Sequence, residues 1–185
     1  MRWMEHLWTG KGDDGTTGLY HGGRVAKDAA EPEALGSVDE AQAAVGVARA
    51  EATAGSPLHD VLTQVCRDLY VVMAELATAP ANAGKLVDGR SRATPGMVAD
   101  IELRTDEAAT RFPPLTDFVV PGQVRLAAQL DVARTLVRRA ERRAVAVAVP
   151  GSSVVPYLNR LSSLLWALAR AEEAAAGGSV RVKEV

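Results

Sequence analysis

The sequence predicts an all-α fold in which the helices pack as an antiparallel five-helix bundle. Hydrophobic residues make up 48% of the chain and are mostly alanine, leucine and valine, whereas aromatic residues make up only 4%. This composition favours packed helices over a β-sandwich. Apolar residues also recur at steps of three and four, the period of a helix with one buried face. The length of 185 residues predicts one domain. Within it we expect a loop over 1–35, the bundle over 36–175 and a tail over 176–185.

The segment before the bundle is rich in glycine. Six glycines lie between Gly10 and Gly23, a density that predicts an irregular loop. Glycines let successive backbone amides turn toward an anion, and Lys11 and Lys27 add positive charge, so this loop is a candidate phosphate site. A Walker A motif is excluded because Thr16 stands where that motif needs lysine. A mobile N-terminal arm is the alternative interpretation.

The first predicted helix begins at Ser37, which can cap it while Glu40 completes a capping box. Its apolar residues Val38, Ala41, Val45 and Ala48 then share one face. The second helix begins at Ser56, a candidate N-cap followed by Pro57 at the first helical position. The polar stretch over 78–92 is predicted to be a surface loop.

The third predicted helix begins at Thr94 and Pro95 and continues to Phe112. Prolines at 113, 114 and 121 interrupt the helical pattern, so we expect a buried turn or elbow there. The fourth helix is predicted over 123–149. The fifth begins at Val155 and carries a stripe of leucines. The tail is expected to be either frayed or a short extended strand.

The fourth predicted helix carries six arginines but only two acidic residues. Arg134, Arg138 and Glu141 share one face beside the alanine and valine face, whereas Arg139 and Arg143 point to the other side. Arginine's planar fork suits bidentate binding of phosphate or carboxylate. Salt bridges that hold the bundle together are the alternative interpretation.

Composition also excludes several classes of protein. The formal charge of −2 gives no positive field that would attract nucleic acid or an anionic membrane. Cys66 is the only cysteine, which excludes an internal disulfide framework. No apolar run approaches the roughly 20 residues of a membrane span, and the N-terminus lacks the apolar region of a signal peptide. We therefore expect a cytoplasmic protein.

Two isolated polar residues are further candidates. Asp39 falls in the first turn of the first predicted helix, where its charge favours the helix dipole. Asn159 lies near the start of the last helix, where asparagine is disfavoured unless its side chain has a specific role. Each is also open to a purely structural explanation.

Six motifs follow one another in a specific order over residues 7–173: TGKGDDGTTG, GGRVAKD, GSVDE, FVVPG, VARTLVRRAERR and YLNRLSSLLWALAR. Together they resemble the PduO-type ATP:cob(I)alamin adenosyltransferases. The resemblance implies a homotrimer of five-helix bundles with active sites at the subunit interfaces. It also implies transfer of the 5′-deoxyadenosyl group from ATP, with Mg²⁺, to cob(I)alamin, giving adenosylcobalamin and triphosphate. A flavin reductase and an adenosylcobalamin-dependent mutase are the implied partner enzymes.

The resemblance assigns ATP to the N-terminal loop and to the arginine-rich helix. The ATP-binding residues that it implies are Thr9, Gly10, Lys11, Gly12, Thr17, Gly18, Lys27, Arg138, Arg139, Ala140, Glu141, Arg142 and Asn159. Arg138 is expected to contact phosphate and to act in catalysis. Glu141 is expected near the nucleotide or its magnesium.

The resemblance implies three more catalytic residues. Asp39 and Arg134 are expected to form an ion pair across a subunit interface. Phe118 is expected under the corrin ring, where it would exclude the lower axial ligand; a core residue in the elbow is the alternative. The chain departs from the family pattern at Gly10, Asp14, Gln123 and Ser163.

Two other functions remain open from the sequence. One is a non-catalytic carrier or sensor of the same fold that binds ATP or adenosylcobalamin. The other is a helical bundle with only a structural role, which predicts no thermal stabilisation by nucleotide.

Overall fold

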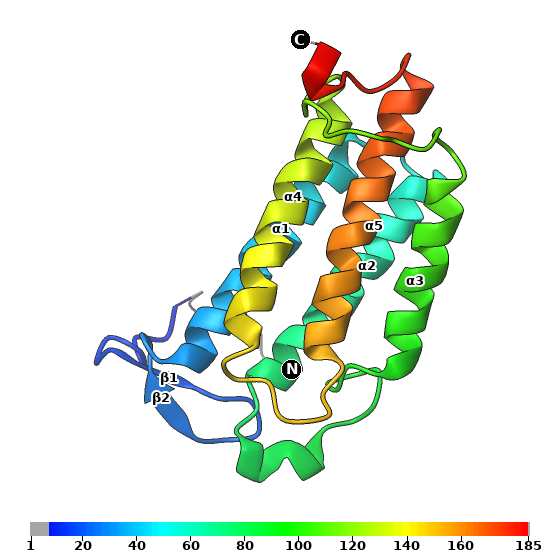
Figure 1. Ribbon diagram of the computed structural model, residues 1–185. Helices are drawn as coiled ribbons and strands as arrows, with labels where there is room; N and C mark the ends of the chain where they lie inside the picture. The colour runs from blue at the N-terminus through cyan, green and yellow to red at the C-terminus, as the bar shows by residue number, and fades with distance from the viewer. Residues whose placement is uncertain (1–7, 185) are drawn as a thin grey trace.

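The computed structural model describes residues 8–184, and in this range the fold is mostly helical, as predicted (Figure 1). Its α-helices are α1 (Ala30–Glu51), α2 (Pro57–Leu76), α3 (Pro95–Ala109), α4 (Arg125–Ala144) and α5 (Val154–Ala175). Two short 3₁₀-helices, η1 (Pro80–Lys85) and η2 (Val182–Glu184), and a small hairpin of β1 (Thr16–Gly18) and β2 (Arg24–Ala26) complete it. Residues 1–7 of the predicted N-terminal loop lie outside the described range.

The predicted starts of α2 and α3 are confirmed. The Ser56 hydroxyl accepts a hydrogen bond from the backbone N–H of His59 at 3.2 Å. The Thr94 hydroxyl accepts one from the N–H of Met97 at 3.3 Å. In both helices a proline follows the cap, where its missing N–H costs no helical hydrogen bond.

The predicted start of α1 is wrong. The helix begins at Ala30, and Ser37 is buried inside it, where its hydroxyl donates to the carbonyl of Glu33 at 2.9 Å. Pro32 is tolerated because it lies in the first turn, where the N–H groups have no helical partner. Asp39 therefore lies in the middle of α1 and not in its first turn, so the expected interaction with the helix dipole is wrong as well.

Consecutive helices run in opposite directions, as predicted for an antiparallel bundle (Figure 1). Antiparallel packing holds for α4 against α1, since Arg139 pairs with Glu40 and Arg143 with the earlier Glu33. Helix α3, however, runs parallel to α5, with Glu102 paired to Arg160 and Arg111 paired to Glu172. Helix α3 packs beside α5 and not beside α4, because residues 110–124, here called the strap, cross the end of the bundle before α4 begins (Figure 1).

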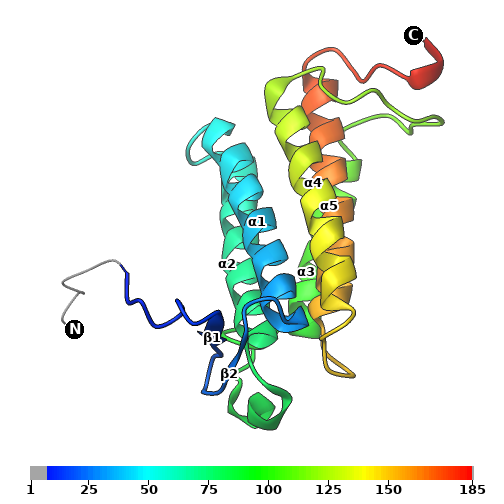
Figure 2. The ribbon, with the colours of Figure 1, turned by 90° about the vertical axis from the view of Figure 1, so that its left-hand side faces the viewer.

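The strap is not the buried elbow that its prolines suggested. None of its residues is buried, and Phe118 is 84% exposed. The C-terminal tail pairs with the strap by an isolated bridge between Arg181 and Val119 and then ends in η2, so only part of it is extended, one of the two predicted alternatives. The N–H of Val120 donates to the carbonyl of Val180, and the N–H of Val182 donates to that of Phe118, each at 2.8 Å. Figure 2 shows the strap and tail at one end of the bundle and the hairpin near the other.

The core lies between the apolar faces of the helices, and it includes the whole face predicted for the first helix. A buried carboxylate also fixes the connections near the hairpin. Glu75 accepts hydrogen bonds from the N–H of Ala93 at 2.7 Å and from the hydroxyl of Ser152 at 2.6 Å. It thereby holds the loops before α3 and before α5 against the end of α2.

Candidate functional site

The N-terminal loop folds into a hairpin around Asp14. Strands β1 and β2 pair antiparallel, with Thr17 opposite Val25. Asp14 accepts hydrogen bonds from the N–H of Thr16 at 2.9 Å and from its hydroxyl at 2.8 Å, and it lies 3.5 Å from Arg24. These contacts, led by the hydrogen bonds from Thr16, hold the pKa of Asp14 below its ordinary value. The acidic residue that departs from the family pattern thus organises the turn.

Glycine is required at two kinds of position in this loop. Gly10 and Gly15 have φ of 63° and 79°, a backbone conformation that favours glycine. At Gly12 a Cβ would lie 3.0 Å from Nζ of Lys27 and 3.1 Å from the carbonyl oxygen of Thr16. The Lys27 ammonium therefore lies directly over the Gly12 turn, as a phosphate site on this loop would need.

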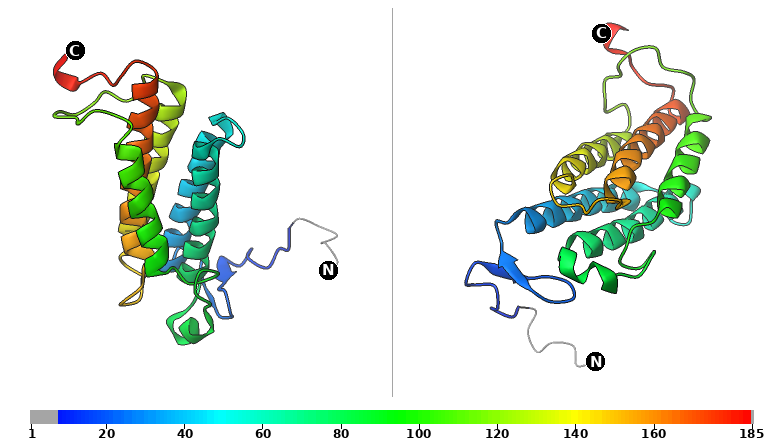
Figure 3. Two further views of the ribbon diagram at one scale, coloured as in Figure 1. Left: turned by 90° about the vertical axis from the view of Figure 1, so that its right-hand side faces the viewer. Right: turned by 60° about the horizontal axis from the view of Figure 1, so that its bottom comes forward.

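The hairpin is fastened to the end of α2. The N–H of Tyr20 donates to the carbonyl of Ala77 at 2.8 Å, and the Asn82 side chain donates to Gly22 at 3.4 Å. This end of the bundle also holds the end of α4 and the start of α5 (Figure 1; Figure 3, right). The two predicted parts of the ATP site thus lie toward the same end of the molecule.

The arginines of α4 divide into paired and unpaired groups. Arg139 pairs with Glu40, and Arg143 pairs with Glu33 at 3.3 Å, so the salt-bridge interpretation holds for these two. Arg138 and Arg142 are exposed, and neither forms an ion pair with any residue of the range 8–184. Their guanidinium groups are available for an anionic ligand.

The structure brings Glu141 and Asn159 together between α4 and α5. The Asn159 amide donates to Oε1 of Glu141 at 2.8 Å, and its oxygen accepts from Arg160 at 2.7 Å. Both residues are half-buried, which explains an asparagine in the first turns of α5. Ala140 is fully buried, so its side chain faces the core.

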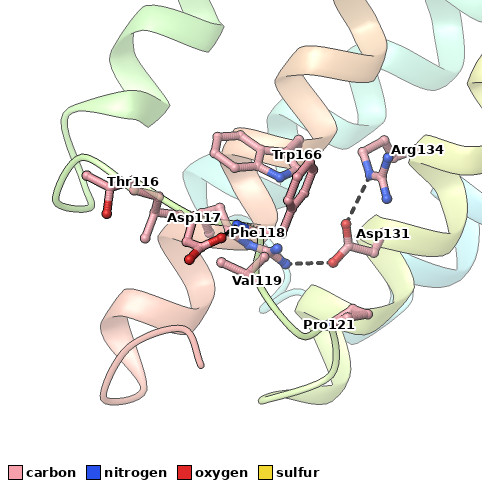
Figure 4. A pocket seen from close by; sticks show the side chains of 10 residues that line it. Thr116, Asp117, Phe118, Val119, Pro121, Asp131, Arg134 and Trp166 are labelled. Carbon is pink, nitrogen blue, oxygen red and sulfur yellow. Dashed lines mark hydrogen bonds and ion pairs between the residues drawn. The ribbon is translucent and has the colours of Figure 1, made fainter. Parts of the chain in front are cut away.

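A cavity of about 610 Å³ lies at the opposite end, under the strap (Figure 4). The strap, α4 and α5 form it. Its lining residues are Leu115, Thr116, Asp117, Phe118, Val119, Pro121, Asp131, Arg134, Trp166 and Arg170. Phe118 lies on the exposed strap, so the interpretation of this residue as part of the core is wrong.

The floor of this cavity is charged, which the sequence analysis missed. Arg170 is buried on α5, and one of its terminal nitrogens lies 2.6 Å from Asp131 and 3.2 Å from Glu173. The signal was present: Arg170 interrupts an apolar stripe, and a charge buried there needs acidic partners. Its guanidinium also lies 5.9 Å from the centre of the Trp166 ring.

Arg134 lines the same cavity as Phe118, so these two predicted catalytic residues are brought together. Within the chain Arg134 pairs with Asp131 at 3.0 Å. Asp39 is exposed on α1 and pairs with no residue of the described range. Its ion pair with Arg134 of another subunit stays a prediction.

In the described part of the chain, no three His, Cys, Asp or Glu side chains are grouped so that they could hold a metal ion. None of the described helices is long and apolar enough to cross a membrane.

The family model for cobalamin adenosyltransferase matches residues 7–172. The chain belongs to this family. The match confirms the resemblance drawn from the motifs, and it runs through the hairpin, the strap and the α4 arginines at 134, 138, 139, 142 and 143.

Relatives in this adenosyltransferase family are similar along most of the chain. A corrinoid adenosyltransferase of Mycobacterium tuberculosis is 42% identical over 172 residues, which cover 90% of this chain and 88% of that protein. The PduO corrinoid adenosyltransferase of Citrobacter freundii is 38% identical over 174 residues, but these cover only 50% of its length.

Solved structures of the family share the fold. A variant PduO-type ATP:corrinoid adenosyltransferase from Lactobacillus reuteri, complexed with cobalamin and ATP, superposes with a TM-score of 0.85 at 26% identity. The superposition covers 96% of this chain and 97% of that one.

Proposed function

We propose that the protein is a corrinoid adenosyltransferase that transfers the 5′-deoxyadenosyl group from ATP to cob(I)alamin and releases triphosphate. One observation carries the proposal: the family match extends through the hairpin and Lys27, which follows it, and also through the cavity lined by Phe118. The reaction forms a bond between cobalt and C5′ of the ribose and breaks the bond between C5′ and the triphosphate oxygen. The electron pair of the broken bond leaves with that oxygen.

The chain's residues supply position and charge in this reaction. Cob(I)alamin is already a strong nucleophile, so no side chain has to activate it. Arg138 and Arg142, which form no ion pair within residues 8–184, would stabilise the negative charge on the leaving triphosphate together with Lys27 over the Gly12 turn. The remaining ATP contacts are proposed on Thr9, Gly10, Lys11, Thr17, Gly18 and Arg139. Ala140 is not among them, because its side chain is buried in the core.

Phe118 is proposed to cover the lower face of the corrin ring. An aromatic side chain that is 84% exposed on a strap is well placed to contact an apolar ligand surface. Removal of the lower axial ligand would favour reduction of the cobalt to Co(I).

We propose that magnesium binds at the Glu141 and Asn159 pair together with the phosphates of ATP. A site made of protein ligands alone would be the less suitable arrangement. Mg²⁺ keeps several waters and takes one or two carboxylates together with substrate phosphates, so it does not need a cluster of acidic residues. Glu141, fixed by Asn159 at 2.8 Å, is the carboxylate proposed to hold it. The ion would supply positive charge to the phosphates of ATP.

A homotrimer with active sites between subunits is part of the proposal. Arg134 lines the cavity under the strap from the middle of α4, whereas the hairpin lies toward the other end of the bundle (Figure 2). Arg138, one turn further along α4, is only about 6 Å from Arg134 along the helix axis. A hairpin from a neighbouring copy that reaches Arg134 and Arg138 would bring ATP beside the corrinoid. The exposed Asp39 is the proposed partner of the neighbour's Arg134.

The proposal also places the protein in the cytoplasm, in line with its single cysteine. There a flavin reductase would supply the electrons for Co(I), and an adenosylcobalamin-dependent mutase would receive the product.

The test is anaerobic turnover of chemically reduced cob(I)alamin with MgATP, followed by the visible spectrum. We expect adenosylcobalamin to form with an equal amount of triphosphate. Thermal stabilisation by ATP without turnover would contradict the enzyme and would favour a carrier or sensor. Absence of both would leave only a structural role.

A further inference from the structure

The Asp131 carboxylate lies between two arginines on the floor of the Phe118 cavity. Its Oδ1 accepts a hydrogen bond from Nε of Arg134 at 3.0 Å, and its Oδ2 accepts one from Nη2 of Arg170 at 2.6 Å. In Figure 4 dashed lines leave the two oxygens of Asp131 in different directions, one of them toward Arg134. One carboxylate therefore connects an arginine of α4 with an arginine of α5.

Burial decreases along this chain of contacts. The exposed fraction of the side chain is 1% for Arg170, 8% for Asp131 and 29% for Arg134. Arg170 is fixed by a second carboxylate, Glu173, and lies close to the Trp166 ring. A charge buried this deeply cannot leave its partners without a large desolvation cost, so Arg170 holds Asp131 in place.

The contact with Asp131 leaves most of Arg134 available. Only Nε of Arg134 is used, and among the described residues its terminal amino groups make no hydrogen bond. Because a guanidinium is planar, fixing Nε restricts the plane in which the terminal groups lie. Those groups remain free to meet a ligand in the cavity or a carboxylate from a second copy of the chain.

We propose that Asp131 is a positioning residue for the corrinoid reaction. The buried Arg170 fixes the Asp131 carboxylate, and this carboxylate in turn fixes the guanidinium of Arg134 at the cavity. This inference rests on the proposed function, since it takes the cavity to be the corrinoid site. The competing account is that Asp131 is only a counter-charge for Arg170. Glu173 separates the two accounts, because within residues 8–184 it pairs with Arg170 and forms no hydrogen bond or ion pair with Arg134.

The experiment compares Asp131→Ala, Asp131→Asn and Glu173→Gln after turnover of the unaltered protein has been established. We expect Asp131→Ala to raise the KM for cob(I)alamin by about tenfold, the loss expected for one charge-assisted hydrogen bond. Asp131→Asn keeps an oxygen acceptor and is expected to raise it less. Glu173→Gln is expected to lower the Tm but to leave this KM within about twofold. For all three the KM for ATP is expected to stay near that of the unaltered protein.

Asp100→Asn is the matched control, since Asp100 pairs with Arg104 of its own helix at 2.7 Å and lies outside the cavity. If Asp131→Ala does not fold, a triple variant with Asp131→Asn, Arg170→Met and Glu173→Gln removes the buried charges together. A raised KM for cob(I)alamin in the folded triple variant supports the proposal. The proposal fails if the KM is unchanged in the folded Asp131 variants, or if Glu173→Gln raises it as much as Asp131→Ala. Absence of turnover in the unaltered protein would instead overturn the function itself.

Discussion

The Asp68 carboxylate lies inside the bundle, where Gln64 donates to it at 2.9 Å and Tyr157 at 3.1 Å. Burial raises the pKa of Asp68 above 3.8, and the two hydrogen bonds offset only part of that shift. Desolvation raises the pKa of the buried Tyr157 as well.

The raised pKa of Asp68 predicts a pH-dependent stability. A carboxyl group with a raised folded-state pKa favours the folded state while it is protonated, and this contribution is lost as the pH rises through that pKa. We therefore expect the Tm of the unaltered protein, minus the Tm of Asp68→Asn, to fall as the pH rises from below 3.8 toward neutrality. Thermal melts across this range measure it. Asp106→Asn, at an exposed position of α3, is the control and should show a nearly constant difference; a parallel result for both variants would refute the prediction.

Because Arg138 forms no ion pair within residues 8–184, its removal is predicted to impair catalysis without impairing the fold. Arg138→Ala removes no ion pair with a described residue, so its Tm is expected to stay close to that of the unaltered protein. Removal of one charged donor from the leaving group should lower kcat by about a hundredfold. Arg143→Ala, which breaks only the exposed pair with Glu33, is the comparison and should keep nearly full turnover. Equal activities for the two variants would exclude the role proposed for Arg138.

For the individual side chains of the site, the sequence could identify the residues but not their partners. Glu141 and Asn159 were both expected in the ATP site, and the structure shows the hydrogen bond that joins them. The pairing of Asp131 with Arg170 spans 39 positions, so no local pattern reveals it. Only the rule that a buried arginine needs an acidic partner pointed toward it.

Two serines near the first turns expected for α1 and α2 predict different effects on stability. Ser56→Ala removes the acceptor for the N–H of His59 and should destabilise the protein by about 1 kcal/mol. Ser37→Ala removes only a bond back to the carbonyl of Glu33 inside α1, and alanine is the better helix former, so its effect should be within about 0.5 kcal/mol. Urea denaturation of both variants measures the difference. A loss at Ser37 as large as that at Ser56 would contradict the assignment of the α1 start.

Helix starts were predictable where the signal is local. The serine or threonine cap and the following proline fix α2 at Pro57 and α3 at Pro95. At α1 the motif around Ser37 imitates a capping box, while Pro32 marks the true first turn. The packing of α3 on α5, and not on α4, was not predictable, because it depends on the path of the strap across the bundle.

Assembly makes a prediction for the whole molecule. If Asp39 pairs with Arg134 of a neighbouring copy, Asp39→Ala should weaken the trimer and shift it toward smaller species at micromolar concentration. Glu40→Ala removes a pair with Arg139 of the same chain and should leave assembly unchanged. Sedimentation velocity measures both. The interface pair is ruled out if Asp39→Ala sediments like the unaltered protein, or if no oligomer forms at all.

Helix α3 packs on the bundle through few buried residues, so it is expected to open more readily than α4. Only Ile101 and Ala108 are buried along its 15 residues, and it lies at the edge of the bundle beside α5 (Figure 3, left). Helix α4 buries seven of its 20 residues. Regions with few buried contacts open locally at a lower free energy than the whole molecule unfolds. Amide protons of α3 should therefore exchange with deuterium before those of α4. Each such opening would loosen the strap that carries Phe118, while α4, which supplies Asp131 and Arg134 to the same cavity, stays folded.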